Sequence, residues 1–86
     1  MIVVRTEQFI RDFKKLSHEL RSRTIKQLQF LATNPRHPSL RIKRIKKTRD
    51  IFEGRINKSY RFTFRITHEA IIIRRAGKHD DMLRNP

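Results

Sequence analysis

The sequence predicts a small α+β protein in which a helical pair covers one face of a single sheet. Two patterns in the 86 residues lead to this class. Segment 60–66 alternates apolar and polar side chains, which is typical of a strand with one buried face. Segment 9–32 carries apolar side chains at helical spacing. We therefore expect an N-terminal strand, an αα-hairpin and then a three-stranded antiparallel meander.

The N-terminal part is expected to form one strand and two helices. The β-branched run 2–4 should pair with the later sheet. Thr6 is a suitable N-cap for the first helix, and Ser17 is one for a second helix that starts near residues 18–19. The second helix should end at Asn34, because the proline that follows disfavours the helical conformation there.

Residues 36–49 form a strongly basic connection. Leu40, Ile42 and Ile45 are interleaved with its cations and should anchor it to the core. The cations would then point outward. A surface of this kind contacts phosphates without reading a base sequence.

The last part of the chain predicts the sheet. The expected strands are 51–56, 60–66 and 70–75, with a turn at 57–59. The face opposite the apolar residues carries Arg55, Arg61 and Arg65, with Glu53 among them. We expect this arginine-lined face to be open to solvent. The tail 80–86 should lie over the sheet or fray.

The charge balance points to a polyanionic partner. Lys and Arg number 22 against 8 Asp and Glu, which gives a net charge of +14. Such an excess destabilises a compact state by self-repulsion, and solubility needs far less. Nucleic acid is the first choice of partner, an acidic protein the second and a membrane surface the third.

Composition also limits the class of protein. The sequence contains no cysteine, which excludes disulfides and thiolate metal sites and suits a reducing compartment. It has no long apolar run and no signal-peptide pattern at its start. We therefore expect a single domain over residues 1–86, located in the cytoplasm, with no membrane partner.

The arginines of the expected open face are the first candidates for chemistry. Guanidinium groups present paired donors to phosphate oxygens, so Arg55 and Arg61 could bind a phosphate and stabilise a phosphorane-like transition state. A solvated face in a basic protein accounts for the same residues. This second interpretation fits Arg65 better, because Arg65 is nearer the end of its strand.

His79 and Glu53 are the candidates for proton transfer. Histidine gains and loses a proton near neutral pH, as general acid–base catalysis requires. His79 could instead be a surface residue beside Asp80, and Glu53 could act as a base or pair with Arg55 or Arg61. The other histidines lack the spacing of metal ligands, so we expect no metal and no cofactor.

Several short motifs occur together in a fixed order along nearly the whole chain. They are Phe13-Lys-Lys-Leu16, Leu31-Ala-Thr-Asn-Pro35, Pro38-Ser-Leu40, Asp50-Ile-Phe-Glu-Gly-Arg-Ile56, Tyr60-Arg-Phe-Thr-Phe64 and Arg75-Ala-Gly-Lys-His-Asp80. In this order and spacing the sequence resembles the RelE/ParE superfamily of toxins from type II toxin–antitoxin systems. The resemblance implies a sheet curved around the helical hairpin. It also implies an acidic, partly helical antitoxin that wraps the toxin in a hetero-oligomer.

The resemblance implies two kinds of activity. Many members cut messenger RNA in the ribosomal A site without a metal, by attack of the ribose 2′-hydroxyl on the adjacent phosphate. ParE-like members poison DNA gyrase instead. The first activity is expected for this chain, with inhibition of translation. The alternative is a non-catalytic gyrase poison or a degenerate module that binds nucleic acid or antitoxin.

Residue roles follow from the same resemblance. Arg61 matches the arginine that contacts the scissile phosphate, whereas Arg55 and Glu53 occupy two positions that are lysines in RelE itself. His79, with Asp81, resembles the tail of YafQ-like members, in which the histidine acts in acid–base catalysis. The expected contacts to ribosome and RNA are Arg41, Lys43, Arg44, Lys46, Lys47, Arg49 and Arg65.

Overall fold

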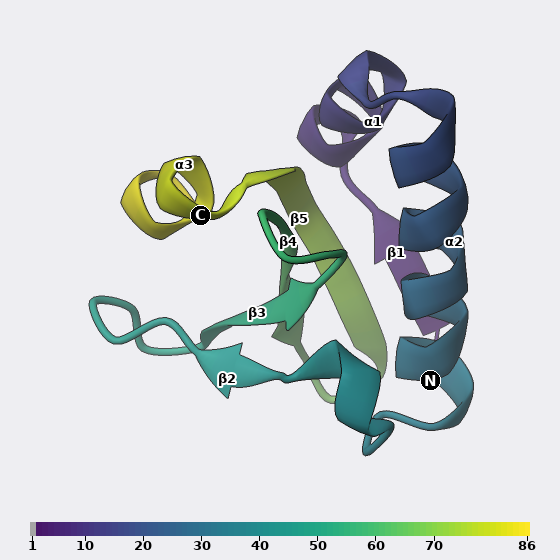
Figure 1. Cartoon of the computed structure of the whole chain (residues 1–86). Helices are drawn as coiled ribbons and strands as arrows, with labels where there is room; N and C mark the ends of the chain where they lie inside the picture. The colour runs from purple at the N-terminus through teal and green to yellow at the C-terminus, as the bar shows by residue number, and fades with distance from the viewer. Residues whose placement is uncertain (1) are drawn as a thin grey trace.

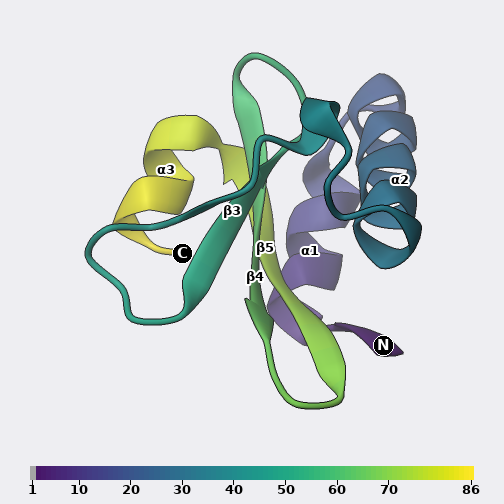
Figure 2. The ribbon, with the colours of Figure 1, turned by 90° about the horizontal axis from the view of Figure 1, so that it is seen from below.

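The computed structural model describes residues 2–86 as one five-stranded sheet with helices on both faces (Figures 1 and 2). In chain order the elements are β1 (Ile2–Arg5), α1 (Glu7–Lys15), α2 (His18–Thr33), the 3-10 turn η1 (Pro38–Leu40), β2 (Lys43–Arg44), β3 (Ile51–Arg55), β4 (Tyr60–Ile66), β5 (Ala70–Lys78) and α3 (His79–Arg84). The strand order is β1-β5-β4-β3-β2. β1 runs parallel to β5, and the other neighbours are antiparallel.

The predicted α+β class and helix boundaries are confirmed. The Thr6 hydroxyl accepts a hydrogen bond from the Phe9 amide at 3.1 Å and so caps α1. The Ser17 hydroxyl accepts one from the Leu20 amide at 3.2 Å and caps α2. Each cap satisfies an amide that has no partner inside its helix. The predicted αα pair therefore follows from two short polar side chains.

The apolar core lies between the sheet and the pair α1 and α2. Phe62 and Phe64 of β4 and Ile73 of β5 are fully buried there, together with Phe9 and Leu31 from the helices. The alternation of apolar and polar side chains in 60–66 thus predicted the buried face of β4 correctly. Burial of aromatic and branched side chains is the main stabilising contribution in a chain of this size.

The basic connection is anchored as predicted but is not entirely irregular. Leu40 and Ile45 are buried at 0% and 3% exposure, and the cations between and after them are exposed. Lys43 and Arg44 form the short strand β2, which pairs with Phe52 and Glu53 of β3. Two residues are too few for a periodic pattern, so the sequence contained no signal for this strand.

The expectation of an open second sheet face was wrong. α3 lies on the side of the sheet opposite α1 and α2 (Figure 2). Met82 of α3 is buried, and so are Glu53 and Thr63 of the face beneath the tail. The Thr63 hydroxyl donates to the Pro86 oxygen at 2.9 Å. The tail therefore lies over the sheet, because it offers one apolar side chain to bury and backbone oxygens to accept bonds.

A buried carboxylate joins α1 to the end of β5 that extends beyond β1. Asp12 accepts hydrogen bonds from Arg75 Nε at 3.0 Å and from the Ala76 amide at 3.0 Å. Gln8 Nε2 donates to the same carboxylate at 3.0 Å. Burial by itself raises the pKa of Asp12, but these hydrogen bonds outweigh it, and the pKa lies below its ordinary value of 3.8. The charged form is thus the one that stabilises the fold.

Asp12→Asn should lower the free energy of unfolding by roughly 1–3 kcal/mol at pH 7, since hydrogen bonds to a charged group are lost. The pKa of Asp12 is lower in the folded state than in the unfolded state. Asp12 therefore stabilises the fold fully at pH values above its unfolded-state pKa. This stabilisation is lost as the pH falls through its folded-state pKa, which lies below 3.8. Urea unfolding from pH 7 to pH 2 should therefore show the two proteins converging at low pH. Glu69→Gln, at an exposed carboxylate, is the control and should change little. A constant difference down to pH 2 would contradict this role.

Candidate nucleic-acid interface

The candidate site lies where the β3–β4 turn meets the start of α3. Arg55 and Arg61 are register partners across β3 and β4, and Arg61 also lies opposite Gly77 of β5. The His79 amide, two residues beyond Gly77, donates to the Ser59 carbonyl in the turn at 2.9 Å. The sheet register therefore brings residues from three distant segments to one end of the molecule.

Arg61 is held firmly in this site. Its Nη1 donates to the Asn57 carbonyl at 2.7 Å and to the Tyr60 carbonyl at 3.0 Å. Its Nε lies 3.5 Å from Glu53 Oε1, and its side chain is 14% exposed. Within residues 2–86 no acceptor is bonded to Nη2, which is therefore the nitrogen left to donate to an external phosphate.

Glu53 lies between the two basic candidates. Its Oε1 is 3.5 Å from Arg61 Nε and 4.0 Å from His79 Nε2. The residue is 2% exposed, and Oε2 is buried without a hydrogen bond from the described residues. Of the two interpretations of Glu53, the structure shows the pairing with Arg61. Glu53 also lines a hollow between the segment around β2 and Leu83 of α3.

His79 is the first residue of α3, and its side chain is 36% exposed. Its Nε2 faces Glu53, and its Nδ1 lies 3.4 Å from Asp80 Oδ1. The structure thus places His79 beside Glu53 and Glu53 beside Arg61, as one cluster. Asp81, which the sequence grouped with His79, instead forms an ion pair with Arg84 at 2.8 Å.

Arg55 belongs to a group of four arginines. Its pKa is lowered, first by partial desolvation and then by the charges of Arg41, Arg61 and Arg23. The sequence predicted Arg55 and Arg61 for the site and Arg41 for the contact surface. It missed Arg23, which is in the middle of α2. No local signal could have revealed Arg23, since tertiary packing alone brings α2 to the end of β3.

Of the other predicted contacts, Lys43 is the register partner of Glu53, whereas Arg65 lies away from this cluster. Arg65 pairs with Asp50 at 3.1 Å, and four residues of extended strand, about 13 Å, separate it from Arg61. Lys47 Nζ donates to the Arg84 carbonyl at 2.7 Å, and Arg44 donates to the Thr48 carbonyl. The exposed cations of the connection are Arg41, Lys43, Arg44, Lys46, Lys47 and Arg49.

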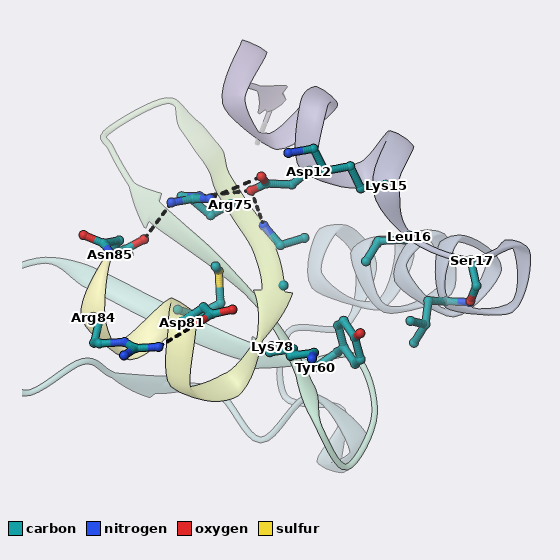
Figure 3. Close-up of a pocket in the computed structure, with 14 residues that line it drawn as sticks. Asp12, Lys15, Leu16, Ser17, Tyr60, Arg75, Lys78, Asp81, Arg84 and Asn85 are labelled. Atoms are coloured by element: carbon teal, nitrogen blue, oxygen red, sulfur yellow. Dashed lines mark hydrogen bonds and ion pairs between the residues drawn. The ribbon is translucent and has the colours of Figure 1, made fainter.

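Among the hollows that border the tail, two lie beside the end of β5. The larger one, about 860 Å³, lies between α1, the end of β5 and α3, and the Asp12–Arg75 and Asp81–Arg84 ion pairs occupy its walls (Figure 3). A smaller one, about 570 Å³, contains His79 together with Lys58, Lys78 and Arg84. Asp80 and Asp81 also line the smaller hollow, whereas Arg61, Glu53 and Arg55 do not. We place the candidate site at the cluster of Arg61, Glu53 and His79, with this hollow on the exposed side of His79.

Residues 2–86 contain no group of three or more His, Cys, Asp or Glu side chains placed to hold a metal ion. Within these residues no helix is long and apolar enough to cross a membrane.

Comparison with known proteins identifies the fold. No protein-family model and no curated protein matches the sequence. A YoeB/ParE toxin from Agrobacterium tumefaciens superposes with a TM-score of 0.78 at 14% identity, over 92% of this chain and 99% of that one. The fold is that of RelE-like toxins.

Two more solved structures agree with this RelE-like fold. The RelB–RelE antitoxin–toxin complex from Methanococcus jannaschii matches at a TM-score of 0.76 and 20% identity, over 96% and 99% of the two chains. A YafQ mutant from E. coli matches with a TM-score of 0.77 and 10% identity, over 93% of this chain and 94% of that one. The expected RelE/ParE-like fold, with its sheet curved against the helical pair, is thereby confirmed.

Met82→Ala should release α3 from the sheet. An isolated helix of six residues has almost no stability of its own, so α3 depends on this buried side chain. Truncating a buried Met typically costs about 2–5 kcal/mol. Hydrogen exchange at the amides of 79–84 should therefore accelerate, while β4 amides stay protected. Arg84→Ala, whose side chain is 71% exposed, is the control. Unchanged protection of α3 in Met82→Ala would contradict this dependence.

Proposed function

We propose that this protein is the toxin of a type II toxin–antitoxin pair and that it cleaves messenger RNA on the ribosome. The observation that carries the proposal is the cluster of Arg61, Glu53 and His79 at one end of the sheet, with Arg55 opposite Arg61. It combines an anion-binding guanidinium with an accessible acid–base group, which metal-free phosphodiester cleavage requires. The RelE-like fold supports the same conclusion.

The proposed reaction needs no metal. The ribose 2′-oxygen attacks the adjacent phosphorus and loses its proton to a base, and the bond from phosphorus to the 5′-oxygen breaks. The products are a 2′,3′-cyclic phosphate and a 5′-hydroxyl, whose proton comes from an acid. His79 carries one of these two proton transfers, while Arg61 and Arg55 bind the phosphate oxygens on which charge grows.

Glu53 acts in this proposal as a positioning residue. It is buried, and it lies against both Arg61 Nε and His79 Nε2. A lysine at this position would place another cation beside the two basic groups, whereas the carboxylate attracts both. The departure from RelE at this position thus gives the cluster an internal counter-ion and leaves phosphate binding to the arginines.

The exposed cations between β2 and β3 and around β2 supply the docking surface in this proposal. They are separate from the His79 cluster in the chain, and they point to solvent around the buried anchor Ile45. Contacts from Lys and Arg to the phosphates of ribosomal RNA would orient the toxin without reading bases. Such docking lets the small site act on a message that the ribosome presents.

The proposed partner of the free toxin is an acidic, partly helical antitoxin. Solved structures with the same fold include the RelB–RelE complex from Methanococcus jannaschii and the YoeB–YefM complex from Staphylococcus aureus. The net charge of +14 favours a partner of opposite charge. Toxin and antitoxin would form a hetero-oligomer in the cytoplasm, where the message is translated.

His79→Ala and Arg61→Ala should each reduce cleavage by about 10²–10³-fold, as is typical when one transition-state contact is removed. The measurement is an in-vitro translation reaction followed by primer extension along the message. Cuts should appear only with translating ribosomes and should follow the codon spacing. His68→Ala, at an exposed turn histidine, is the matched control and should cleave normally. Circular dichroism should show all three variants folded.

A DNA-synthesis assay with gyrase, run beside the translation reaction, separates the alternatives, and two outcomes would reject nuclease activity. If the message stays intact while DNA synthesis stalls with gyrase-dependent breaks, the protein is a ParE-like gyrase poison. If neither process is affected, it is a binding module that keeps the fold without the chemistry. Full cleavage by both His79→Ala and Arg61→Ala would reject the assigned residues.

A further inference from the structure

Arg23 of α2 and Arg41 after η1 lie near Arg55 at the end of β3, and Arg55 is the cross-strand partner of Arg61. We propose that Arg23 and Arg41 form, with Arg55, a second phosphate-binding subsite for the phosphodiester next to the one at Arg61, and that Arg55 lies between the two phosphates. This inference rests on the proposed function, in which RNA is the substrate. We call the three residues the arginine subsite.

Side chains of α2 hold the arginine subsite together. Arg23 Nε donates to the Ile56 carbonyl at 2.7 Å, directly after Arg55. One turn later, Gln27 Nε2 donates to the Arg55 carbonyl at 2.8 Å and to the Ser39 carbonyl at 3.2 Å. Gln27 is only 3% exposed, so these bonds are shielded from water. One helix face thus fixes the end of β3 and the segment that leads to Arg41.

The backbone at Arg41 indicates a requirement for this side chain. Arg41 has φ 45° and ψ 47°, and it is the one non-glycine residue with positive φ in residues 2–86. The left-handed region is unfavourable for residues with a Cβ, and glycine or asparagine usually occupies it. An arginine here therefore suggests a role for its charge that outweighs the conformational cost.

The charges of the arginine subsite have no acidic partner inside the described chain. No ion pair in residues 2–86 includes Arg23, Arg41 or Arg55, and the carboxylate of Glu53 lies against Arg61 and His79 instead. The lowered pKa of Arg55, caused by partial desolvation and by Arg41, Arg61 and Arg23, reflects the same repulsion. A bound anion would remove this repulsion.

The geometry favours RNA over an acidic protein segment as the source of the anion. Arg55 and Arg61 are direct cross-strand partners, so their Cβ atoms lie about 5 Å apart, and a chain that is bound at one passes the other. Protein interfaces have an apolar centre. Ile56 and Leu40 beside the subsite are buried, whereas the exposed Ile10 and Ile25 line a different hollow, between α1 and α2.

The salt dependence of RNA binding tests the arginine subsite. The probe is a fluorescein-labelled single-stranded RNA of ten mixed nucleotides, measured by anisotropy with proteins that also carry His79→Ala to prevent cleavage. Arg23→Gln with Arg41→Gln should weaken binding at low salt. The slope of log K against log salt should become less steep by about 0.7, which corresponds to one lost phosphate contact. The control, Arg5→Gln with Lys14→Gln, changes the net charge equally at other exposed sites and should keep the slope.

Arg41→Gly separates binding from folding. Glycine adopts the left-handed conformation without strain, so the thermal midpoint should be unchanged or higher while RNA binding weakens. A lower thermal midpoint with unchanged RNA binding would overturn the subsite and make Arg41 a structural residue.

The two proposals fail in different ways. If the Arg23/Arg41 double variant keeps the slope of its control, the arginine subsite is refuted, even where His79→Ala abolishes cleavage on the ribosome. If the double variant no longer binds polyglutamate but its slope of log K for RNA binding against log salt equals that of the control, the subsite binds an acidic protein and the inference is overturned. A less steep slope of log K for RNA binding against log salt upholds the subsite whether or not messenger RNA is cleaved.

Discussion

The end of β5 and the tail after it are held in place by the buried carboxylate of Asp12. It holds Arg75 and the Ala76 amide at the part of β5 that β1 does not reach. Arg75 in turn donates to the Asn85 carbonyl at 3.2 Å, so the same interaction reaches the tail. With Met82 buried, the tail covers Glu53 and starts α3 at His79. A contact on the first helix thereby influences the position of the proposed acid–base residue.

The cations of this protein differ in whether a carboxylate of the described residues lies beside them. Arg75, Arg65 and Arg84 each have a carboxylate within 3.1 Å, and their charges are balanced inside the protein. Arg23, Arg41 and Arg55 have no such partner among the described residues and converge at the end of β3. A basic protein repels itself least when its surplus charge is spread out. Three of these cations meeting at the end of β3 is therefore a local exception, and a bound polyanion would offset their repulsion.

The buried Glu53 shows how the fold limits an interpretation made from sequence. Parity along β3 correctly put Glu53 on the face opposite the aromatic core, and an open face would have made it a possible base. The tail closes that face, so the carboxylate pairs with Arg61 and leaves Oε2 without a hydrogen bond from residues 2–86. Whether a tail of a few residues folds over a sheet depends on one methionine and a few backbone bonds, which leave no periodic signal.

The sequence by itself determined the order of the elements, the helix caps at Thr6 and Ser17, the buried face of β4 and the anchors of the basic connection. These features arise from interactions between residues close in the chain, and such interactions leave a local pattern. Only the tertiary structure decided the closure by α3, the strand β2, and the meeting of Arg23 and Gln27 with β3. Those depend on contacts between distant segments, and the register and packing that create such contacts are not encoded in any single stretch.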